Sequence, residues 1–375
     1  LKEIVVKAPA VYQHGDTLSF NLSSYITQSD YTLKDALKKL PGIDIEESGK
    51  IRYLGKEISN FYIDGLDLLG GKYNIATTNI PASYVNSVQV LNNHQPVNMN
   101  RDIFSDDVAI NIKMSRNARF KPVGTYEGSV GYGDNWLYNV SGAGMLFKPK
   151  FQTIATLKIG NVHSFALDET ASLFGDIEEK SKAEKLMGNI SASTPPTDKD
   201  RYATPSERLF SVNFISKTSE TATLRGNVDY CYSKSQYDYD IHQNFYGGEE
   251  NIIINQGINS LSTSHSPSFS IVYKNNAVTS YINNTLFGKA TFLSNDLPTT
   301  ENGLSLIQRQ SMRDYYVGNK FSYSWRKGKL RWNLSSSVLL VCAPKVMLTI
   351  TNEENDINQS VNSLSFQTKN VLSAI

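Results

Sequence analysis

The 375-residue chain carries 37 Lys and Arg residues against 36 Asp and Glu residues, so its formal net charge at pH 7 is +1. This balance gives no argument for nucleic-acid binding, and no basic stripe is present. The two cysteines, Cys231 and Cys342, lack zinc-like spacing and do not make a disulfide framework. The longest apolar runs, such as residues 338–343, fall far short of the ~20 residues that a transmembrane helix needs.

The first part of the chain mixes helical and strand patterns. Apolar residues recur at helical spacing over residues 31–40, behind Asp30 as the expected N-cap, and Gly42 follows the end of this helix. Short apolar runs separated by turns then indicate strands near residues 43–45, 51–53 and 58–63. We therefore expect a small α/β domain over residues 16–115.

From residue 124 onward the pattern changes to a strict alternation of apolar and polar residues. In residues 222–233, for example, Val228 and Tyr230 alternate with Asn227 and Asp229. Since successive side chains of a strand point to opposite faces, one face is apolar and aromatic and the other is polar. We place strands near residues 124–132, 137–147, 151–161, 208–216, 222–234, 266–274, 277–292, 312–325, 330–341 and 360–369.

The connections between these strands distinguish a barrel from a sandwich. Tight polar turns at residues 148–150, 217–221, 274–276 and 326–329 mostly alternate with long links at residues 162–207, 236–265, 293–312 and 342–359. Transmembrane barrels combine short periplasmic turns with long extracellular loops, and their strands need only ~9–11 residues to cross the membrane. The pattern favours a transmembrane barrel, with the long links outside the cell; a soluble β-sandwich is the alternative.

Four short motifs occur in order along the first part of the chain: Leu40-Pro41-Gly42-Ile43, residues 61–65 (FYIDG), residues 80–91 (IPASYVNSVQVL) and residues 109–113 (AINIK). Together they resemble the plug domain of TonB-dependent outer-membrane receptors. The resemblance implies a small α/β plug domain at residues 16–115 and an antiparallel transmembrane β-barrel from residue 116 to residue 375. Barrels of about 22 strands have lumens that a plug fills. The strands placed above are roughly half of the number in such a barrel. We therefore expect the chain to be an internal fragment that holds about half of a barrel.

Residues 1–15 read as a TonB-box-like segment and linker. The run of Glu3, Ile4, Val5, Val6 and Lys7 resembles the segment that pairs with the TonB energy-transducing protein, and its β-branched residues suit strand addition. The same run also resembles the junction that follows a carboxypeptidase-regulatory-like domain. The alternative is therefore the last strand of an upstream domain.

The resemblance implies a function and a location. We expect a receptor in the cell outer membrane of a Gram-negative bacterium that imports a ligand, such as a siderophore or a glycan, into the periplasm. Its expected partners are TonB, the lipid of the outer membrane, an unknown small ligand and a surface lipoprotein. The alternative is a surface-exposed binding protein without active transport. We expect no enzyme activity, no cofactor and no metal site, since the histidines are scattered without ligand spacing.

Ligand contacts are expected from the plug apex, residues 66–79, together with the long links between strands rather than from the barrel wall. Lys72, Tyr73 and Asn74 place a cation, an aromatic ring and an amide beside two glycines, a mixture that suits a concave recognition site. The alternative is an ordinary turn at the glycines with Tyr73 packed inside. The segment from residue 92 to residue 107 departs from the plug pattern, so the role of that loop does not carry over.

Overall fold

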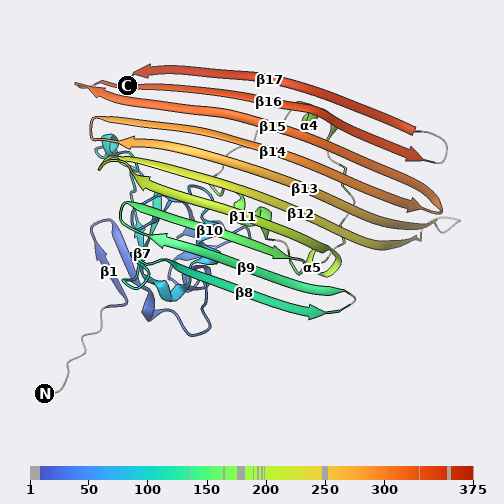
Figure 1. Cartoon of the computed structure of the whole chain (residues 1–375), viewed down its shortest axis with the longest axis horizontal. Helices are drawn as coiled ribbons and strands as arrows, with labels where there is room; N and C mark the ends of the chain where they lie inside the picture. Colours follow the sequence, from blue (N-terminus) through green and yellow to red (C-terminus); the bar gives the residue numbers. More distant parts are fainter. Residues whose placement is uncertain are drawn as a thin grey trace.

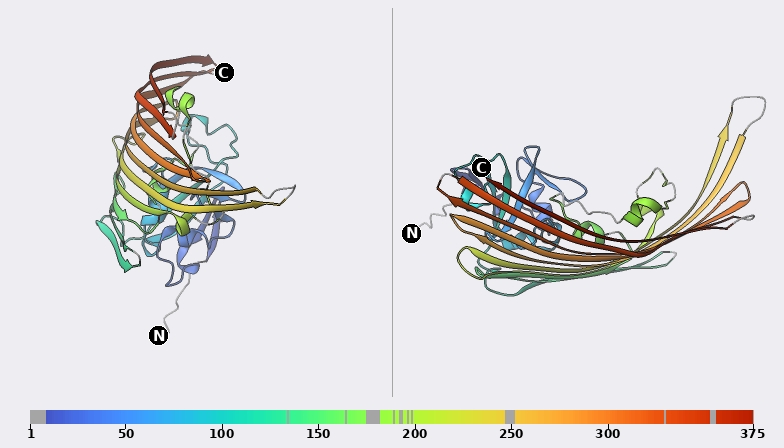
Figure 2. Two further views of the ribbon diagram at one scale, coloured as in Figure 1. Left: turned by 90° about the vertical axis from the view of Figure 1, so that its right-hand side faces the viewer. Right: turned by 90° about the horizontal axis from the view of Figure 1, so that it is seen from above.

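The structure is a computed structural model of the chain, and it describes residues 9–133, 135–163, 165–174, 182–188, 190–191, 194–195, 197, 199–246, 252–328, 330–352 and 356–374. Within these residues the strands form two sheets, one of seven and one of ten strands. The larger sheet, which we call the wall, is broad and curved, and the smaller, which we call the inner sheet, lies within its curvature at one end (Figures 1 and 2). Most of the described chain is therefore antiparallel sheet with few helices.

The inner sheet has the order β1-β2-β6-β7-β5-β4-β3, and only the β5–β7 pair is parallel. Its strands are β1 (Val11–His14), β2 (Thr17–Asn21), β3 (Ile43–Ile45), β4 (Ile51–Tyr53), β5 (Lys56–Ile63), β6 (Val85–Leu91) and β7 (Val108–Met114). Two α-helices, α1 (Leu33–Leu37) and α2 (Asn74–Asn79), pack beside it, with single turns of 3-10 helix at Leu22–Ser24, Ala82–Tyr84 and Asn98–Asn100. A mixed α/β unit thus precedes the wall.

Helix α1 begins at a different cap from the one expected. Thr32, rather than Asp30, is the N-cap: its side chain accepts from the backbone N–H of Asp35, and the Asp35 carboxylate accepts from the N–H of Thr32. This reciprocal capping box satisfies two backbone donors at once. Asp30 instead accepts from the N–H of Thr27 and from Lys39 Nζ. The cap prediction was wrong by two residues because both positions carry suitable oxygens.

The wall is a succession of antiparallel hairpins in sequence order from β8 to β17. Its strands are β8 (Val123–Tyr132), β9 (Trp136–Phe147), β10 (Phe151–Gly160), β11 (Thr204–Lys217), β12 (Ala222–Phe245), β13 (Ile252–Asn276), β14 (Ser280–Glu301), β15 (Leu304–Lys327), β16 (Leu330–Asn352) and β17 (Asp356–Ala374). Short helices α3 (Ala166–Thr170), α4 (Lys182–Met187) and α5 (Lys199–Tyr202) lie in the β10–β11 connection. This order matches the up-and-down succession expected from the sequence.

Three of the four long links are not loops. β14 runs to Glu301 and β15 begins at Leu304, so most of residues 293–312 is paired strand. Residues 236–265 and 342–359 are likewise mostly strand, and the tight turn expected at residues 274–276 lies after Asn276. Backbone pairing needs only the N–H and C=O groups, so a ladder continues where the apolar pattern stops. The resulting hairpins extend past the region that the inner sheet occupies (Figure 2).

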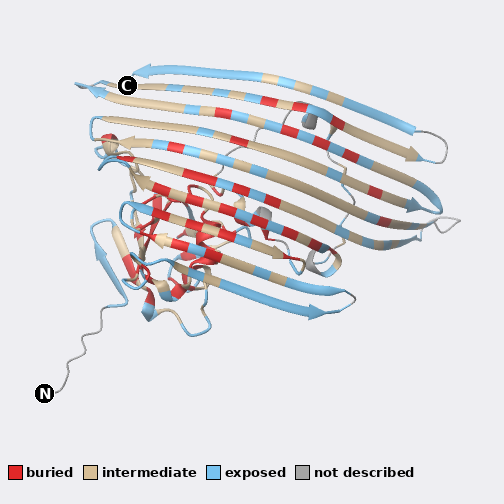
Figure 3. Ribbon diagram, viewed as in Figure 1, coloured by how far each residue is buried: buried red, intermediate tan, exposed pale blue. Residues whose placement is uncertain are grey.

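The two faces of the wall differ as the alternation predicted. Val228, Phe210 and Val317 on the outer face are 49%, 46% and 49% exposed, whereas Asn213, Asn227 and Asp229 on the inner face are buried. Burial is concentrated where the wall meets the inner sheet (Figure 3). None of the helices in the described part of the chain is long and apolar enough to cross a membrane.

Candidate functional site: the contact between the inner sheet and the wall

The loop that leaves β5 inserts into the wall. Asp64 and Gly65 have φ angles of 48° and 83°, so the chain turns sharply there, and the N–H of Gly65 donates to Asn111 Oδ1 at 2.9 Å. Gln152 of β10 donates to the carbonyl of Ile63 at 2.8 Å. Residues 64–72, which we call the apex loop, are thereby directed at the inner face of β12.

Asp67 is the central charge of the apex loop. Its carboxylate lies 2.6 Å from Arg225 Nη1 and 4.0 Å from Lys274 Nζ, and it accepts from the N–H of Gly70 at 2.9 Å. Burial alone would raise the pKa of Asp67, but the charges of Arg225 and Lys274 outweigh it and hold the pKa below its ordinary value. Asp67 is therefore a carboxylate that joins the loop to two strands of the wall.

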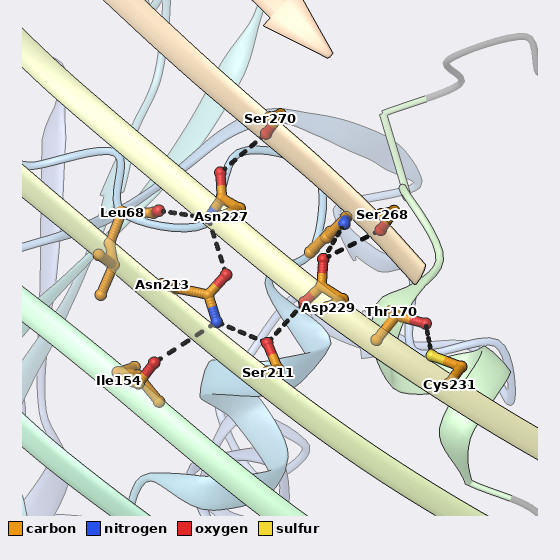
Figure 4. A network of polar contacts seen from close by, with 11 residues as sticks. Leu68, Ile154, Thr170, Ser211, Asn213, Asn227, Asp229, Cys231, Ser268 and Ser270 are labelled. Carbon is orange, nitrogen blue, oxygen red and sulfur yellow. Dashed lines mark hydrogen bonds and ion pairs between the residues drawn. The ribbon is translucent and has the colours of Figure 1, made fainter. Parts of the chain in front are cut away.

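A second ion pair involves Lys72, the last residue of the apex loop. Lys72 Nζ lies 2.5 Å from Asp229 Oδ2, and the Asp229 side chain is only 1% exposed. Ser211 donates to the other oxygen of Asp229 at 2.6 Å, and Ser268 donates to Oδ2 at 3.4 Å (Figure 4). Removing two charges from water is costly, so a buried ion pair is stable only where further hydrogen bonds satisfy the remaining oxygen lone pairs. Ser211 and Ser268 supply these bonds to Asp229.

Amide side chains extend this network along the wall. Asn227 donates to the carbonyl of Leu68 at 3.4 Å and to Asn213 Oδ1 at 2.7 Å, and it accepts from Ser270 at 3.2 Å (Figure 4). Asn213 in turn donates to Ser211 at 2.8 Å. The polar face predicted from alternation is therefore a connected hydrogen-bond network that reaches the apex loop.

The two glycines of the apex loop allow close approach. Gly70 has a φ of +58°, and a Cβ there would lie 3.0 Å from Arg225 Nη2; a Cβ at Gly71 would lie 2.3 Å from Ser172 Oγ. The N–H of Leu173 donates to the carbonyl of Gly71 at 2.9 Å. Both glycines are needed for packing, on one side against the wall and on the other against the β10–β11 connection.

Of the three predicted ligand residues, Tyr73 and Asn74 are buried. Tyr73 is 0% exposed, its hydroxyl accepts from the N–H of Ile51 at 3.1 Å, and its ring lies 5.3 Å from those of Phe61 and Phe174. Burial raises the pKa of Tyr73 to about 12. The ring therefore fills the core under the loop, as in the alternative of a packed Tyr73, and its contact with a ligand stays a prediction.

Asn74 joins three parts of the chain. Its side-chain amide donates to the carbonyl of Ser48 at 2.9 Å and to that of Asp168 at 3.0 Å. Nearby, Glu169 of α3 lies 2.5 Å from Lys158 Nζ. Asn74 thus connects helix α3 to the inner sheet, and residues 165–174, which we call the cover segment, pack inward onto the apex loop. Nothing in the local sequence signals these contacts.

A second attachment lies at the short-turn end of the wall. Asn98 donates from its backbone N–H and its side chain to Asn276, at 2.8 and 2.7 Å. Asp102 lies 2.7 Å from Arg331 and 3.4 Å from Arg326. These residues belong to the segment that departs from the plug pattern, so that segment holds the inner sheet to the rim of the wall.

The other predicted site residues belong to the N-terminal segment. Glu3, Ile4, Val5, Val6 and Lys7 lie outside the described residues. Within the residues that the structure describes, no group of His, Cys, Asp and Glu side chains is arranged to hold a metal ion. The site that remains is a set of buried ion pairs and amides between two sheets.

No protein-family model and no curated protein matches this chain. Among solved structures it is similar to the ferric yersiniabactin uptake receptor FyuA from Yersinia pestis, at 13% identity and a TM-score of 0.40 over 97% of this chain and 62% of that one. It is also similar to FpvA of P. aeruginosa, in complex with a ferric pyoverdine, at 10% identity and a TM-score of 0.32, over 96% of this chain and 54% of FpvA. The ferric-catecholate import receptor Fiu from E. coli K12 gives 10% identity and a TM-score of 0.33, over 96% and 62%. The chain therefore spans little more than half of the length of these proteins.

Proposed function

We propose that this chain is part of a TonB-dependent outer-membrane receptor, in which the wall is a section of a transmembrane barrel and the inner sheet is its plug. The observation that carries the proposal is the outer face of the wall. Large apolar side chains such as Phe210, Val228, Phe269, Val317 and Leu340 are exposed side by side across it. A continuous apolar surface of this extent needs a partner, and lipid is the partner of a barrel's outer face.

The direction of insertion follows from the two ends of the wall. At the end beside the inner sheet the strands stop at short turns, after β9, β11, β13 and β15, whereas at the other end the hairpins β12–β13, β14–β15 and β16–β17 extend past the inner sheet. Short turns face the periplasm in such barrels. The long hairpins, β12–β13 among them, then project from the cell.

Import requires the plug to move or to unfold in part. An uptake channel would have to break the ion pairs of Asp67 and Lys72 with the wall, and these are buried and supported by hydrogen bonds. Because breaking buried ion pairs is costly, the opening needs force from a partner. We propose that TonB supplies it by strand addition at the segment from Glu3 to Lys7.

The ligand is proposed to reach the apex loop from the side of the long hairpins. Lys72 keeps 23% of its side chain exposed, whereas Tyr73 and Asn74 lie under the cover segment. Ligand contact with Tyr73 and Asn74 then requires the cover segment to move. A small ligand and a surface lipoprotein remain the proposed partners.

The proposal is tested by binding of the periplasmic domain of TonB to the full-length protein in detergent. Ile4→Pro should abolish this binding, because proline removes a backbone donor from the added strand, whereas Lys2→Ala should retain it. Alkaline carbonate extraction should leave the protein in the membrane fraction. Retained insertion without TonB binding would favour the alternative function, a surface binding protein without transport; release into the soluble fraction would refute both.

A further inference from the structure

The outer face of the wall changes character at the end of its apolar band nearer the long hairpins. On β11 the outward residue beyond Phe210 is Arg208, and on β12 the one beyond Tyr232 is Lys234. Arg208 also lies 5.2 Å over the ring of Tyr232. On these two strands the first charge beyond the apolar band is therefore positive.

The same change occurs on β15 and β16. Beyond Tyr315 the next outward residue is Arg313, and Arg313 is the direct cross-strand partner of Lys345. Both side chains are exposed. Like charges directly opposite each other destabilise a sheet, so this pairing has a cost that a bound anion would relieve.

In the described parts of β11 to β16, no acidic side chain on the same face stands next to these four cations. Among the described outward residues of β11 to β16, the nearest acids are Asp238, two outward positions beyond Lys234, and Asp296 on β14. Asp296 is already paired, 3.2 Å from Arg309. On this face of the described strands, acidic residues thus occur only beyond the four cations, toward the tips of the long hairpins.

Resting on the proposed membrane placement, we propose that Arg208, Lys234, Arg313 and Lys345 bind the phosphate groups of phosphorylated lipids in the outer leaflet. Arginine and lysine at a membrane surface attract anionic headgroups, and arginine matches phosphate oxygens with two parallel hydrogen bonds. The position favours a lipid over a soluble anion, because the apolar band directly beside the cations is available to the acyl chains. The two pairs are separated by Tyr232, His265 and Phe292, so each pair holds its own headgroup.

The test uses the full-length protein in a neutral detergent, with phosphatidic acid as the probe. Native mass spectrometry should detect retained phosphatidic acid but not diacylglycerol with the same acyl chains. The double variant Arg313→Gln with Lys345→Gln should lose one of the two retained phosphatidic acid molecules, because the pair Arg208 and Lys234 is unchanged. The matched control is Arg309→Gln, which lies on the same face but is paired with Asp296, and it should retain the lipid.

Each other outcome overturns the inference. Equal retention of diacylglycerol would mean that the apolar band alone holds the lipid, and displacement of phosphatidic acid by millimolar inorganic phosphate would mean a site for soluble anions. Unchanged retention in the double variant would remove these cations from the site. Carbonate extraction of the same samples separates the two proposals: a protein that stays in the membrane but lacks phosphate-dependent binding refutes only this inference.

Discussion

Asp67 is the residue whose replacement most directly tests how the inner sheet is held. Asp67→Asn keeps the size of the side chain and removes its charge, and Arg225 and Lys274 are then left without their carboxylate. The amide still fills the same space beside the N–H of Gly70. The variant therefore reports on charge pairing rather than on packing.

The size of the effect follows from burial. Asp67 and Arg225 are each 17% exposed, and removing one partner of a buried ion pair costs about 3–5 kcal/mol. Arg225 keeps its hydrogen bond to the carbonyl of Asp67 at 3.1 Å, and Lys274 is 28% exposed and can reach water. We therefore expect the lower end, about 3 kcal/mol for opening of the apex loop.

Amide hydrogen exchange measures this opening, because local unfolding exposes the amides of one segment without unfolding the wall. A loss of about 3 kcal/mol corresponds to about 100-fold faster exchange. Peptides that cover the apex loop, residues 64–72, should show it, while peptides from β12 should not. Asp44→Asn, an exposed carboxylate on the inner sheet, is the control and should leave exchange unchanged. If Asp67→Asn exchanged no faster than Asp44→Asn, the ion pair would not hold the loop.

Four further outcomes are expected. In the parent protein, the protection of the apex loop against exchange, corrected for the intrinsic rate, should be complete above the ordinary carboxyl pKa of about 3.9. It should be lost as the pH falls through the pKa of Asp67, which is lower than that value. The variant Asp67→Asn should show no such loss. Asn74→Ala removes the hydrogen bond of about 1 kcal/mol to the carbonyl of Asp168 and should speed exchange in the cover segment by about fivefold, with equal exchange refuting the link. Under the proposed membrane placement, a cysteine at Val228 should label from the lipid phase and one at Asn227 should not; similar labelling would contradict the assignment of faces. Asp102→Asn should leave exchange at the rim attachment close to that of the parent protein, because the side chain is 51% exposed; a clear acceleration would show that this attachment behaves as a buried pair.

The faces of the wall could be predicted from the sequence, and the ends of its strands could not. Alternation with period two is a local property, so Val228 and Asp229 were assigned to opposite faces from their spacing alone, and their exposures agree. Beyond Gln236 the polarity reverses, with Asp238 outward and Tyr237 inward. The apolar alternation on the outer face ends there, but the backbone ladder continues, because hydrogen bonding between strands does not depend on side-chain polarity.

The candidate site was beyond reach of the sequence for a different reason. The resemblance implied an apex at residues 66–79, and in the structure residues 64–72 lie against the wall. Lys72 and Asp229, however, are 157 residues apart in sequence, and no local pattern specifies such a pair. Whether Tyr73 faces a ligand or the core depends on the cover segment, which packs over it from another part of the chain. Local spacing thus determined which face each side chain takes, whereas only the tertiary fold decided which charges meet and which are removed from water.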